Sequence, residues 1–273
     1  MQPVTTLTIA GSDSGGGAGI QGDLRTFAAF GVHATCALTA VTAQNTLRVT
    51  DVLALDPDLV EAQVRAVTSD FEVRAVKTGM LARAATVERV ADLARDGVLA
   101  QLVVDPVLVS STGQLLMAEG GVEAYREALL AHALVVTPNL REAAALCGVD
   151  VRDVKDVDDM ATLAATLLEL GPTYVLVKGG HVDRGSPRAD HSPDVLLSAD
   201  GLTIFDAPRV RTTNDHGTGC SLSAAICAGL ALGRSVPDAT RDAKSFVLAA
   251  LQGASTWRVG TGHGPIDHLG WNS

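Results

Sequence analysis

The sequence predicts an α/β protein in which helices cover both faces of a central, mainly parallel sheet. Short β-branched runs alternate with longer segments of helical period along the 273 residues. Hydrophobic residues make up 47% of the chain and charged residues 19%, so enough apolar surface is present for a large core. No segment repeats at a fixed period, and we expect a single domain over residues 1–273.

The expected strands are short apolar or β-branched runs, each followed by turn residues. They cover residues 4–10, 33–41, 51–55, 73–78, 101–106, 133–138 and 174–180. Residues 194–206 read as two further strands around the turn Ser-Ala-Asp-Gly, so an antiparallel pair is expected there.

The expected helices lie between these strands, where apolar residues recur at helical spacing and a glycine often ends the segment. They cover residues 20–30, 57–70, 86–97, 121–132, 140–148, 157–171, 219–233 and 236–255. Residues 181–197 interrupt the pattern with prolines, charges and no periodicity. We interpret them as a loop beside the site, because the sheet pattern continues on both sides.

The acidic balance of the chain excludes several kinds of partner. The formal net charge is −10, whereas phosphate backbones and acidic membranes are bound by clustered Lys and Arg. We therefore expect neither nucleic acid nor a membrane as a partner. No apolar run approaches the ~20 residues that span a bilayer, and no charged segment followed by an apolar one opens the chain, so we expect a cytoplasmic protein.

The four cysteines show no spacing typical of a disulfide framework or a zinc site. Cys36, Cys147 and Cys227 are interpreted as small buried residues. Cys220 differs because it lies at the start of a predicted helix. The aligned peptide dipoles there lower the pKa of a thiol, so the position predicts a thiolate that accepts a proton or attacks an electrophile.

A glycine-rich segment, Gly11–Ile20, follows the first strand and opens a helix. Five of its ten residues are glycines, but the spacing matches neither of the common nucleotide-binding glycine motifs. It is either a flexible connection or a place where a flat ligand lies against bare backbone. The number of glycines favours the ligand, because a turn alone needs fewer.

Ligands bind beyond the carboxyl ends of the strands in an open parallel sheet, so the residues that follow each strand are the candidates. Gln44 offers a donor and an acceptor side by side, the complement of an aminopyrimidine edge, although a turn or cap residue is the simpler interpretation. Met80 either packs its thioether against the aromatic ring of a ligand or belongs to the core.

A carboxylate and an amide three residues apart follow the strand expected at residues 133–138. Asn139 and Glu142 share one side of a first helical turn, and Asp105 ends the neighbouring strand. Together they could hold Mg²⁺ directly or through its waters. Asn139 and Glu142 also match a helix capping box, and both roles can hold at once.

Two segments present groups suited to a phosphate. Lys178 ends an apolar strand and precedes two glycines, so an ammonium and exposed backbone amides are expected together; a solvated lysine is the alternative. Gly217, Thr218 and Gly219 open a helix, where unpaired N–H groups and aligned dipoles stabilise an anion.

Several of these segments resemble one family, in order, along nearly the whole chain. They are AGSDSGGGAGIQ, TAQNT, VKTGML, VVDPV, TPNLREA, VKGGH, NDHGTGCSLSAAI and GHGPIDHL. The chain resembles the bacterial hydroxymethylpyrimidine/phosphomethylpyrimidine kinases of thiamine biosynthesis, which belong to the ribokinase-like superfamily. The resemblance implies a homodimer that uses MgATP to phosphorylate 4-amino-5-hydroxymethyl-2-methylpyrimidine, and then phosphorylates the monophosphate to the diphosphate.

The resemblance also implies roles for individual residues. Gln44 would bind the amino edge of the pyrimidine, with the ring lined by Gly11, Ala18, Met80 and Val107. Asp105, Asn139 and Glu142 would serve the magnesium and phosphates, and Lys178 the phosphates of ATP. Gly217, Thr218 and Gly219 would form an anion hole, and Cys220 would be the base for the first transfer.

Two other functions remain open at this point. Some enzymes of the same cysteine-bearing branch phosphorylate vitamin B6 alcohols, so a pyridoxal or pyridoxine kinase is the nearest alternative. A pyrimidine- or nucleotide-binding protein without catalytic activity is the other.

Overall fold

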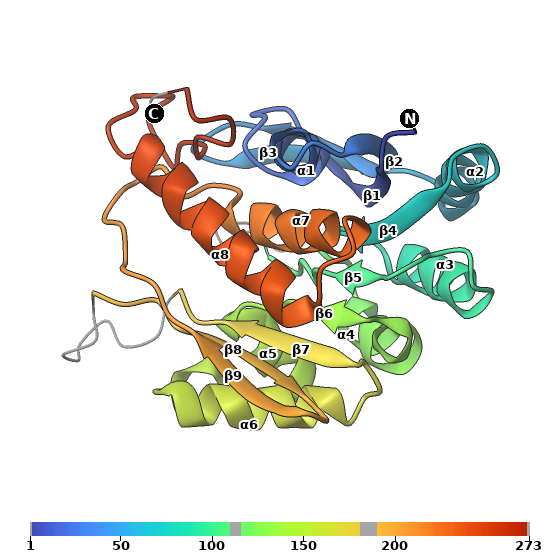
Figure 1. Ribbon diagram of the computed structural model, residues 1–273. Coiled ribbons are helices and arrows are strands. Elements are labelled where there is room, and N and C mark those ends of the chain that lie inside the picture. The colour runs from blue at the N-terminus through green and yellow to red at the C-terminus, as the bar shows by residue number, and fades with distance from the viewer. Residues whose placement is uncertain (1, 110–115, 181–189, 272–273) are drawn as a thin grey trace.

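The computed structural model describes residues 2–109, 116–180 and 190–271, and a nine-stranded sheet forms its centre (Figure 1). The strands are β1 (Thr5–Asp13), β2 (His33–Gln44), β3 (Val49–Ala54), β4 (Val73–Thr78), β5 (Val103–Val104), β6 (Val135–Val136), β7 (Tyr174–Lys178), β8 (Asp194–Ser198) and β9 (Gly201–Phe205). The helices are α1 (Gly19–Ala29), α2 (Pro57–Thr68), α3 (Ala84–Arg95), α4 (Gly121–Ala124), α5 (Leu140–Cys147), α6 (Val157–Leu168), α7 (Thr218–Ala231) and α8 (Val236–Gly253).

The sheet is mostly parallel, which confirms the predicted fold class. Its strand order is β3-β2-β1-β4-β5-β6-β7-β8-β9, and every pair from β2 to β7 is parallel. β8 and β9 form the expected antiparallel pair, and β3 pairs antiparallel with β2 at the opposite edge. The chain leaves β1 first toward β2 and later returns to its other side as β4, so the strand order reverses at β1.

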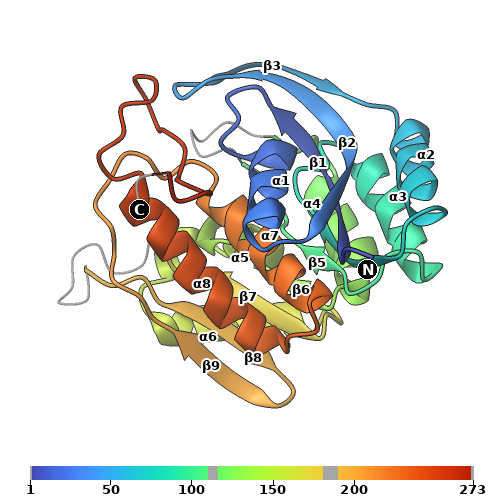
Figure 2. The same cartoon turned by 45° about the horizontal axis from the view of Figure 1, so that its top comes forward.

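Helices cover both faces of the sheet and bury two separate apolar cores. Successive strand residues point to opposite faces, and Val104 and Val136 accordingly pack with α2 to α6 while Val103 and Val135 pack with α1, α7 and α8. Figure 2 shows α1, α7 and α8 together on one side of the sheet. The near-continuous apolar runs of the central strands follow from burial on both faces.

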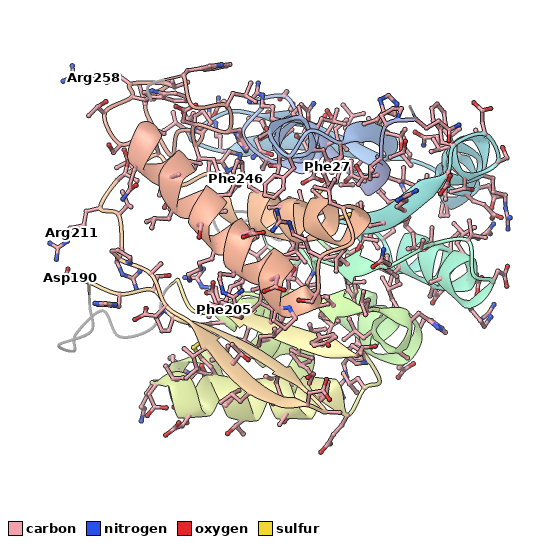
Figure 3. All side chains as sticks on the ribbon, viewed as in Figure 1. Phe27, Asp190, Phe205, Arg211, Phe246 and Arg258 are labelled. Atoms are coloured by element: carbon pink, nitrogen blue, oxygen red, sulfur yellow. The ribbon has the colours of Figure 1, made fainter. Side chains whose placement is uncertain are left out.

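An aromatic pair joins two helices of the second core. Phe27 of α1 is fully buried there, and Phe246 of α8 packs edge to face against Phe30 with ring centroids 5.3 Å apart (Figure 3). Edge-to-face packing is the favoured arrangement of aromatic rings at this separation.

The strands next to the glycine segment are longer than predicted. We expected them to end at Ala10 and Val41, but pairing continues to Asp13 and Gln44 across an irregularity between Ala10 and Ser12. Gly11 therefore lies in β1 and Gln44 at the end of β2, rather than in loops. β5 and β6 are shorter than predicted, at two residues each.

The helix expected over residues 121–132 is regular only in its first turn. After α4, residues Tyr125–Leu129 form a π-helical turn and Leu130–His132 a 3-10 turn. The π turn adds a residue to one turn of the helix, and the neighbouring side chains Leu129 and Leu130 are both fully buried. Helical period alone does not predict where an α-helix changes to a π or 3-10 turn.

None of the described helices combines the length and the hydropathy that a membrane span requires.

Replacing Phe27 with Ala should lower the free energy of unfolding by about 3–5 kcal/mol, because a fully buried ring leaves a cavity. The measurement is urea unfolding followed by circular dichroism. Phe71 is 39% exposed, so Phe71→Ala serves as the matched control and should cost about 1 kcal/mol or less. Equal losses in the two variants would contradict the assignment of Phe27 to the core.

Candidate active site

The candidate residues gather at the carboxyl edge of the sheet, around the point where the strand order reverses. The segment after β1 meets the start of α7, and the ends of β2, β4, β5 and β7 surround them. Such a reversal is where ligands bind in open α/β sheets.

The glycine segment is folded around one carboxylate. Asp13 accepts hydrogen bonds from the N–H groups of Gly15, Gly17 and Ala18 at 2.8, 3.1 and 2.9 Å, and from the ring of His216 at 2.8 Å. Burial raises the pKa of Asp13, but the bonds from His216 and the amides lower it by more, so the carboxyl group stays ionised. The segment is therefore an ordered loop rather than a flexible connection.

The predicted anion cradle lies against this loop. Gly217 caps α7 with a positive φ of 88°, and a Cβ there would be only 1.9 Å from the carbonyl oxygen of Gly17. The first N–H groups of a helix have no intrahelical acceptor, and among the described residues none accepts from Gly219 or Cys220. These two amides follow Thr218 in the first turn of α7, where they are placed to bind an anion.

Lys178 points its ammonium at the same helix start. A Cβ on Gly219 would lie 3.2 Å from Lys178 Nζ, and Nζ also donates to Asp105 Oδ1 at 2.8 Å. Burial lowers the pKa of Lys178, but the carboxylates of Asp105 and Glu142 raise it by more, so the group stays charged. The alternative of a solvated lysine is wrong.

We expected the backbone amides beside Lys178 to be exposed to a ligand, but at least one of them is used within the protein. Gly179 donates its N–H to Asp194 Oδ1 at 2.9 Å, and Asp194 also pairs with Lys244 of α8 at 2.6 Å. A Cβ on Gly179 would lie 1.9 Å from the Pro193 carbonyl oxygen, so this glycine serves close packing of β7 against β8. Of the loop interpreted as lying beside the site, residues 181–189 fall outside the described part of the chain.

Cys220 lies in the first turn of α7, but its thiol is not acidified there. Burial raises the pKa of Cys220 to about 11; the ammonium of Lys77 and the N–H of Gly19 lower it, while Asp105 raises it further. The prediction of a ready thiolate is wrong, because desolvation outweighs the helix dipole. The residue keeps partial exposure, so a ligand can reach it.

A fully buried ion pair underlies this cysteine. Lys77 donates to both carboxylate oxygens of Asp23 at 2.9 and 2.8 Å, Thr8 adds a third bond at 2.6 Å, and both charged side chains are 0% exposed. Burial lowers the pKa of Lys77, but Asp23, Cys220 and Asp105 raise it by more, so the ammonium persists. Sequence reasoning missed the pair, although a lysine inside the apolar run VRAVKT was a usable signal.

Asn139 and Glu142 form the capping box. Asn139 Oδ1 accepts the N–H groups of Arg141 and Glu142 at 2.9 and 3.0 Å, and Glu142 Oε2 accepts the Asn139 N–H at 2.7 Å. Burial raises the pKa of Glu142 to about 7, against the opposing effect of Lys178. Among the described residues, no three His, Cys, Asp or Glu side chains gather as a preformed metal site.

Asp105 sits at the centre of the polar contacts. Besides Lys178, its carboxylate accepts from Thr137 at 3.3 Å and from Ser223 of α7 at 3.2 Å. It thus joins β5, β6, β7 and α7 at one point, and it is almost fully buried.

The residues expected to line a ring lie around the carboxyl-terminal part of β1. A Cβ on Gly11 would be 2.4 Å from Met80 Cε, so the glycine leaves space for that side chain. Met80 is buried in a small cluster against which Val107 packs, and Ala18 begins α1 with partial exposure. Gln44 is partly exposed at the end of β2, with its amide 3.4 Å from the ring of His216.

The other cysteines are unpaired, as expected, and differ in burial. Cys227 is fully buried in the second core, which confirms its packing role, whereas Cys36 and Cys147 keep partial exposure. Burial raises the pKa of all three thiols, and none of the three lies at the start of a helix.

Comparison with known proteins identifies the family of the chain. The family described as phosphomethylpyrimidine kinase matches residues 13–267. A hydroxymethylpyrimidine/phosphomethylpyrimidine kinase of Rhizobium meliloti is 47% identical over 264 residues, which cover 96% of each chain.

Solved structures agree as well. The pyridoxal kinase of Staphylococcus aureus, in complex with AMP-PCP and pyridoxal, superposes with a TM-score of 0.86 at 33% identity over 98% of this chain and 94% of that one. A phosphomethylpyrimidine kinase of Clostridium difficile superposes with a TM-score of 0.78 at 36% identity over 90% and 99% of the two chains. The chain has the ribokinase-like fold and belongs to the phosphomethylpyrimidine kinase family.

Proposed function

We propose that this protein transfers phosphate from ATP to 4-amino-5-hydroxymethyl-2-methylpyrimidine and then to the resulting monophosphate, as a step in thiamine biosynthesis. One observation carries the proposal: Cys220 lies at the start of α7 beside the anion cradle, and its thiol accepts from the N–H of Gly19, which packs against Gly11 of the expected ring site. The family match and the names of the relatives support it. Residues 1–273 would act as one kinase domain.

A pyridoxal kinase is the second candidate. The structural likeness to the Staphylococcus aureus pyridoxal kinase favours it, but that protein is 33% identical, compared with 47% for the Rhizobium meliloti pyrimidine kinase. A binding protein without activity fits poorly, because Lys178 pairs with Asp105 and both charges interact with the accessible thiol of Cys220.

In the first transfer, Cys220 acts as the general base. Its thiolate accepts the proton of the hydroxymethyl group as the oxygen attacks the terminal phosphate of ATP. The N–H groups of Gly219 and Cys220 and the ammonium of Lys178 neutralise the charge of the migrating phosphoryl group. Gln44 holds the pyrimidine edge, so that the hydroxyl group faces the sulfur.

The second transfer needs no base. A phosphate oxygen of the monophosphate is already an anion at neutral pH, because its second pKa is about 6. The backbone amides of Gly217 to Cys220 and the ammonium of Lys178 again neutralise the charge of the migrating phosphoryl group. The thiol of Cys220 has no proton to accept in this step.

We propose that Mg²⁺ accompanies ATP and is held by Asp105 and Glu142 through its waters. The carboxylates suit a hard cation, but each already accepts hydrogen bonds from the protein. Both lone pairs of Asn139 Oδ1 are used by the capping box, so Asn139 serves the phosphates through its Nδ2 donor. Mg²⁺, when bound, would neutralise phosphate charge.

We also propose that the enzyme is a cytoplasmic homodimer. The β2–β3 edge exposes three large apolar side chains, Val41 at 45%, Leu47 at 56% and Leu53 at 65%, which suit a contact with a second copy. The cytoplasm supplies the ATP that the reaction consumes.

The function is tested by an ATP-coupled assay with the pyrimidine alcohol, its monophosphate and pyridoxal. We expect turnover of both pyrimidines and a lower kcat/KM for pyridoxal. Turnover of pyridoxal well above both pyrimidines would favour the vitamin B6 alternative. Tight pyrimidine binding without phosphate transfer would favour a binding protein.

Cys220→Ala should slow the first phosphorylation by ~10²- to 10⁴-fold and leave the second nearly unchanged. Because only the thiolate accepts a proton and the pKa of Cys220 is about 11, its thiolate fraction rises about tenfold per pH unit near neutrality. The wild-type first transfer should therefore accelerate from pH 7 to 9, and the second should not. Equal loss in both steps, with a flat profile, would show that Cys220 is structural.

Glu142→Gln should separate the capping role from the metal role. A glutamine oxygen still accepts the Asn139 N–H, so the melting temperature should stay close to the wild-type value, whereas Glu142→Ala should lose about 1 kcal/mol of stability. Removal of the carboxylate should raise the Mg²⁺ concentration for half-maximal activity on the order of tenfold. An unchanged Mg²⁺ requirement in Glu142→Gln would limit Glu142 to the cap.

A further inference from the structure

Residues 262–269, which read GHGPIDHL, contribute no group to the proposed mechanism, although they lie against the site. His263 donates its N–H to the Thr46 carbonyl oxygen at 2.9 Å, just after the end of β2. The carbonyl oxygen of Gly264 accepts the N–H of His216 at 3.0 Å. The segment is therefore fixed by backbone bonds to the end of β2 and to the residues that precede α7.

His268 carries the contact of this segment with α7. Its Nε2 lies 2.8 Å from the hydroxyl oxygen of Ser221, and the two residues are 4% and 0% exposed. A Cβ on Gly22 of α1 would lie 3.7 Å from the same nitrogen. The ring of His268 is therefore buried where α1 and α7 meet, near the N-terminal ends of both helices.

The hydrogen bond runs from Ser221 to His268. Burial and the guanidinium of Arg25 lower the pKa of His268 to about 4, so the ring is neutral near pH 7. A neutral imidazole has one N–H group, and the Ile266 carbonyl group accepts it. Since Nε2 faces Ser221, it presents a lone pair, and the buried hydroxyl donates to it.

Ser221 is the boundary between the free and the bonded amides of α7. Its own N–H donates to the Gly217 carbonyl oxygen at 2.8 Å, whereas the N–H groups of Gly219 and Cys220 meet no acceptor in the described part of the chain. Two of the four residues before Ser221 are glycines, so this turn has few conformational restraints of its own. A side-chain bond at Ser221 therefore restricts the rotation of the turn that carries the free amides.

We propose that His268, through Ser221, holds the first turn of α7 so that the N–H groups of Gly219 and Cys220 face the terminal phosphate of ATP. His268 and Ser221 are positioning residues, because both side chains are buried and act through the backbone of α7. The inference rests on the proposed function, which supplies ATP as the phosphoryl donor.

The test compares two nucleotides that differ in the terminal phosphate. The dissociation constants of AMP-PCP and of ADP, both with Mg²⁺, are measured by isothermal titration calorimetry. His268→Phe keeps a ring but removes the acceptor, so it should weaken AMP-PCP binding about tenfold and leave ADP binding nearly unchanged. Ser221→Ala should have the same effect. The double variant should be no weaker than either single variant, because both remove one bond.

Two controls separate positioning from general stability. His268→Gln offers an amide oxygen as the acceptor and should restore most of the AMP-PCP affinity. Thr240→Val removes a fully buried hydroxyl that donates to the Val236 carbonyl oxygen of α8 at 2.8 Å, and it should leave the ratio of the two dissociation constants unchanged.

Kinetics give a second readout. Both phosphorylations should slow by a common factor in His268→Phe, since both use the amides of α7, whereas loss of the Cys220 thiol should affect only the first. Ser221→Ala decides the matter if His268→Phe does not fold. A parallel loss of both nucleotide affinities, an unchanged ratio, or a loss in His268→Gln as large as in His268→Phe overturns the inference alone. A wild type that binds neither nucleotide overturns it together with the proposed function.

Discussion

The carboxylate of Asp13 is the contact on which the arrangement of the site depends. It is charged and almost fully buried, and it is stabilised only because three backbone amides and the ring of His216 donate to it. Those four donors come from the loop after β1 and from the start of α7, which are separated by about two hundred residues along the chain. One anion therefore fixes the relative positions of two helix N-termini, and the space between those termini is where the candidate chemistry is found.

Positive and negative charges compensate each other at this edge of the sheet. Lys77 and Lys178 bring two ammonium groups beneath the first turn of α7, and Asp23 and Asp105 compensate them by ion pairs. The cysteine at the same turn experiences all four charges together with burial, and the sum favours the neutral thiol. Buried compensated charges keep the cradle ready for an incoming phosphate without leaving an unpaired cation in the free protein.

Much of the fold could be predicted from the sequence, because apolar period and turn residues are local properties. The alternation of strands and helices, the antiparallel pair at β8 and β9 and the capping box at Asn139 all follow from spacing alone. The extension of β1 through Gly11 could not be predicted, since it depends on pairing with β2 across an irregularity. The π turn at Tyr125–Leu129 was not predicted either, because apolar spacing does not distinguish it from an α-helical turn.

Many residues of the candidate site could be predicted from the sequence, but the electrostatics of the site could not. The strand-end rule found Gln44, Asp105 and Lys178, and the glycine pattern found the start of α7. The pKa of Cys220 was mispredicted, because the helix dipole is visible in the sequence while the depth of burial is not. Sequence reasoning missed Asp13, Asp23 and His216 for a similar reason. Their ion-pair partners are distant in sequence, and the sequence does not show which charged residues pair in the fold.

The close approach of Gly17 to Gly217 has a thermodynamic consequence. With no room for even a methyl group between them, the loop after β1 and the start of α7 cannot move closer together. If the proposed substrates bind on these two sides, any change that one makes in the affinity of the other is matched in the reverse direction by the same factor.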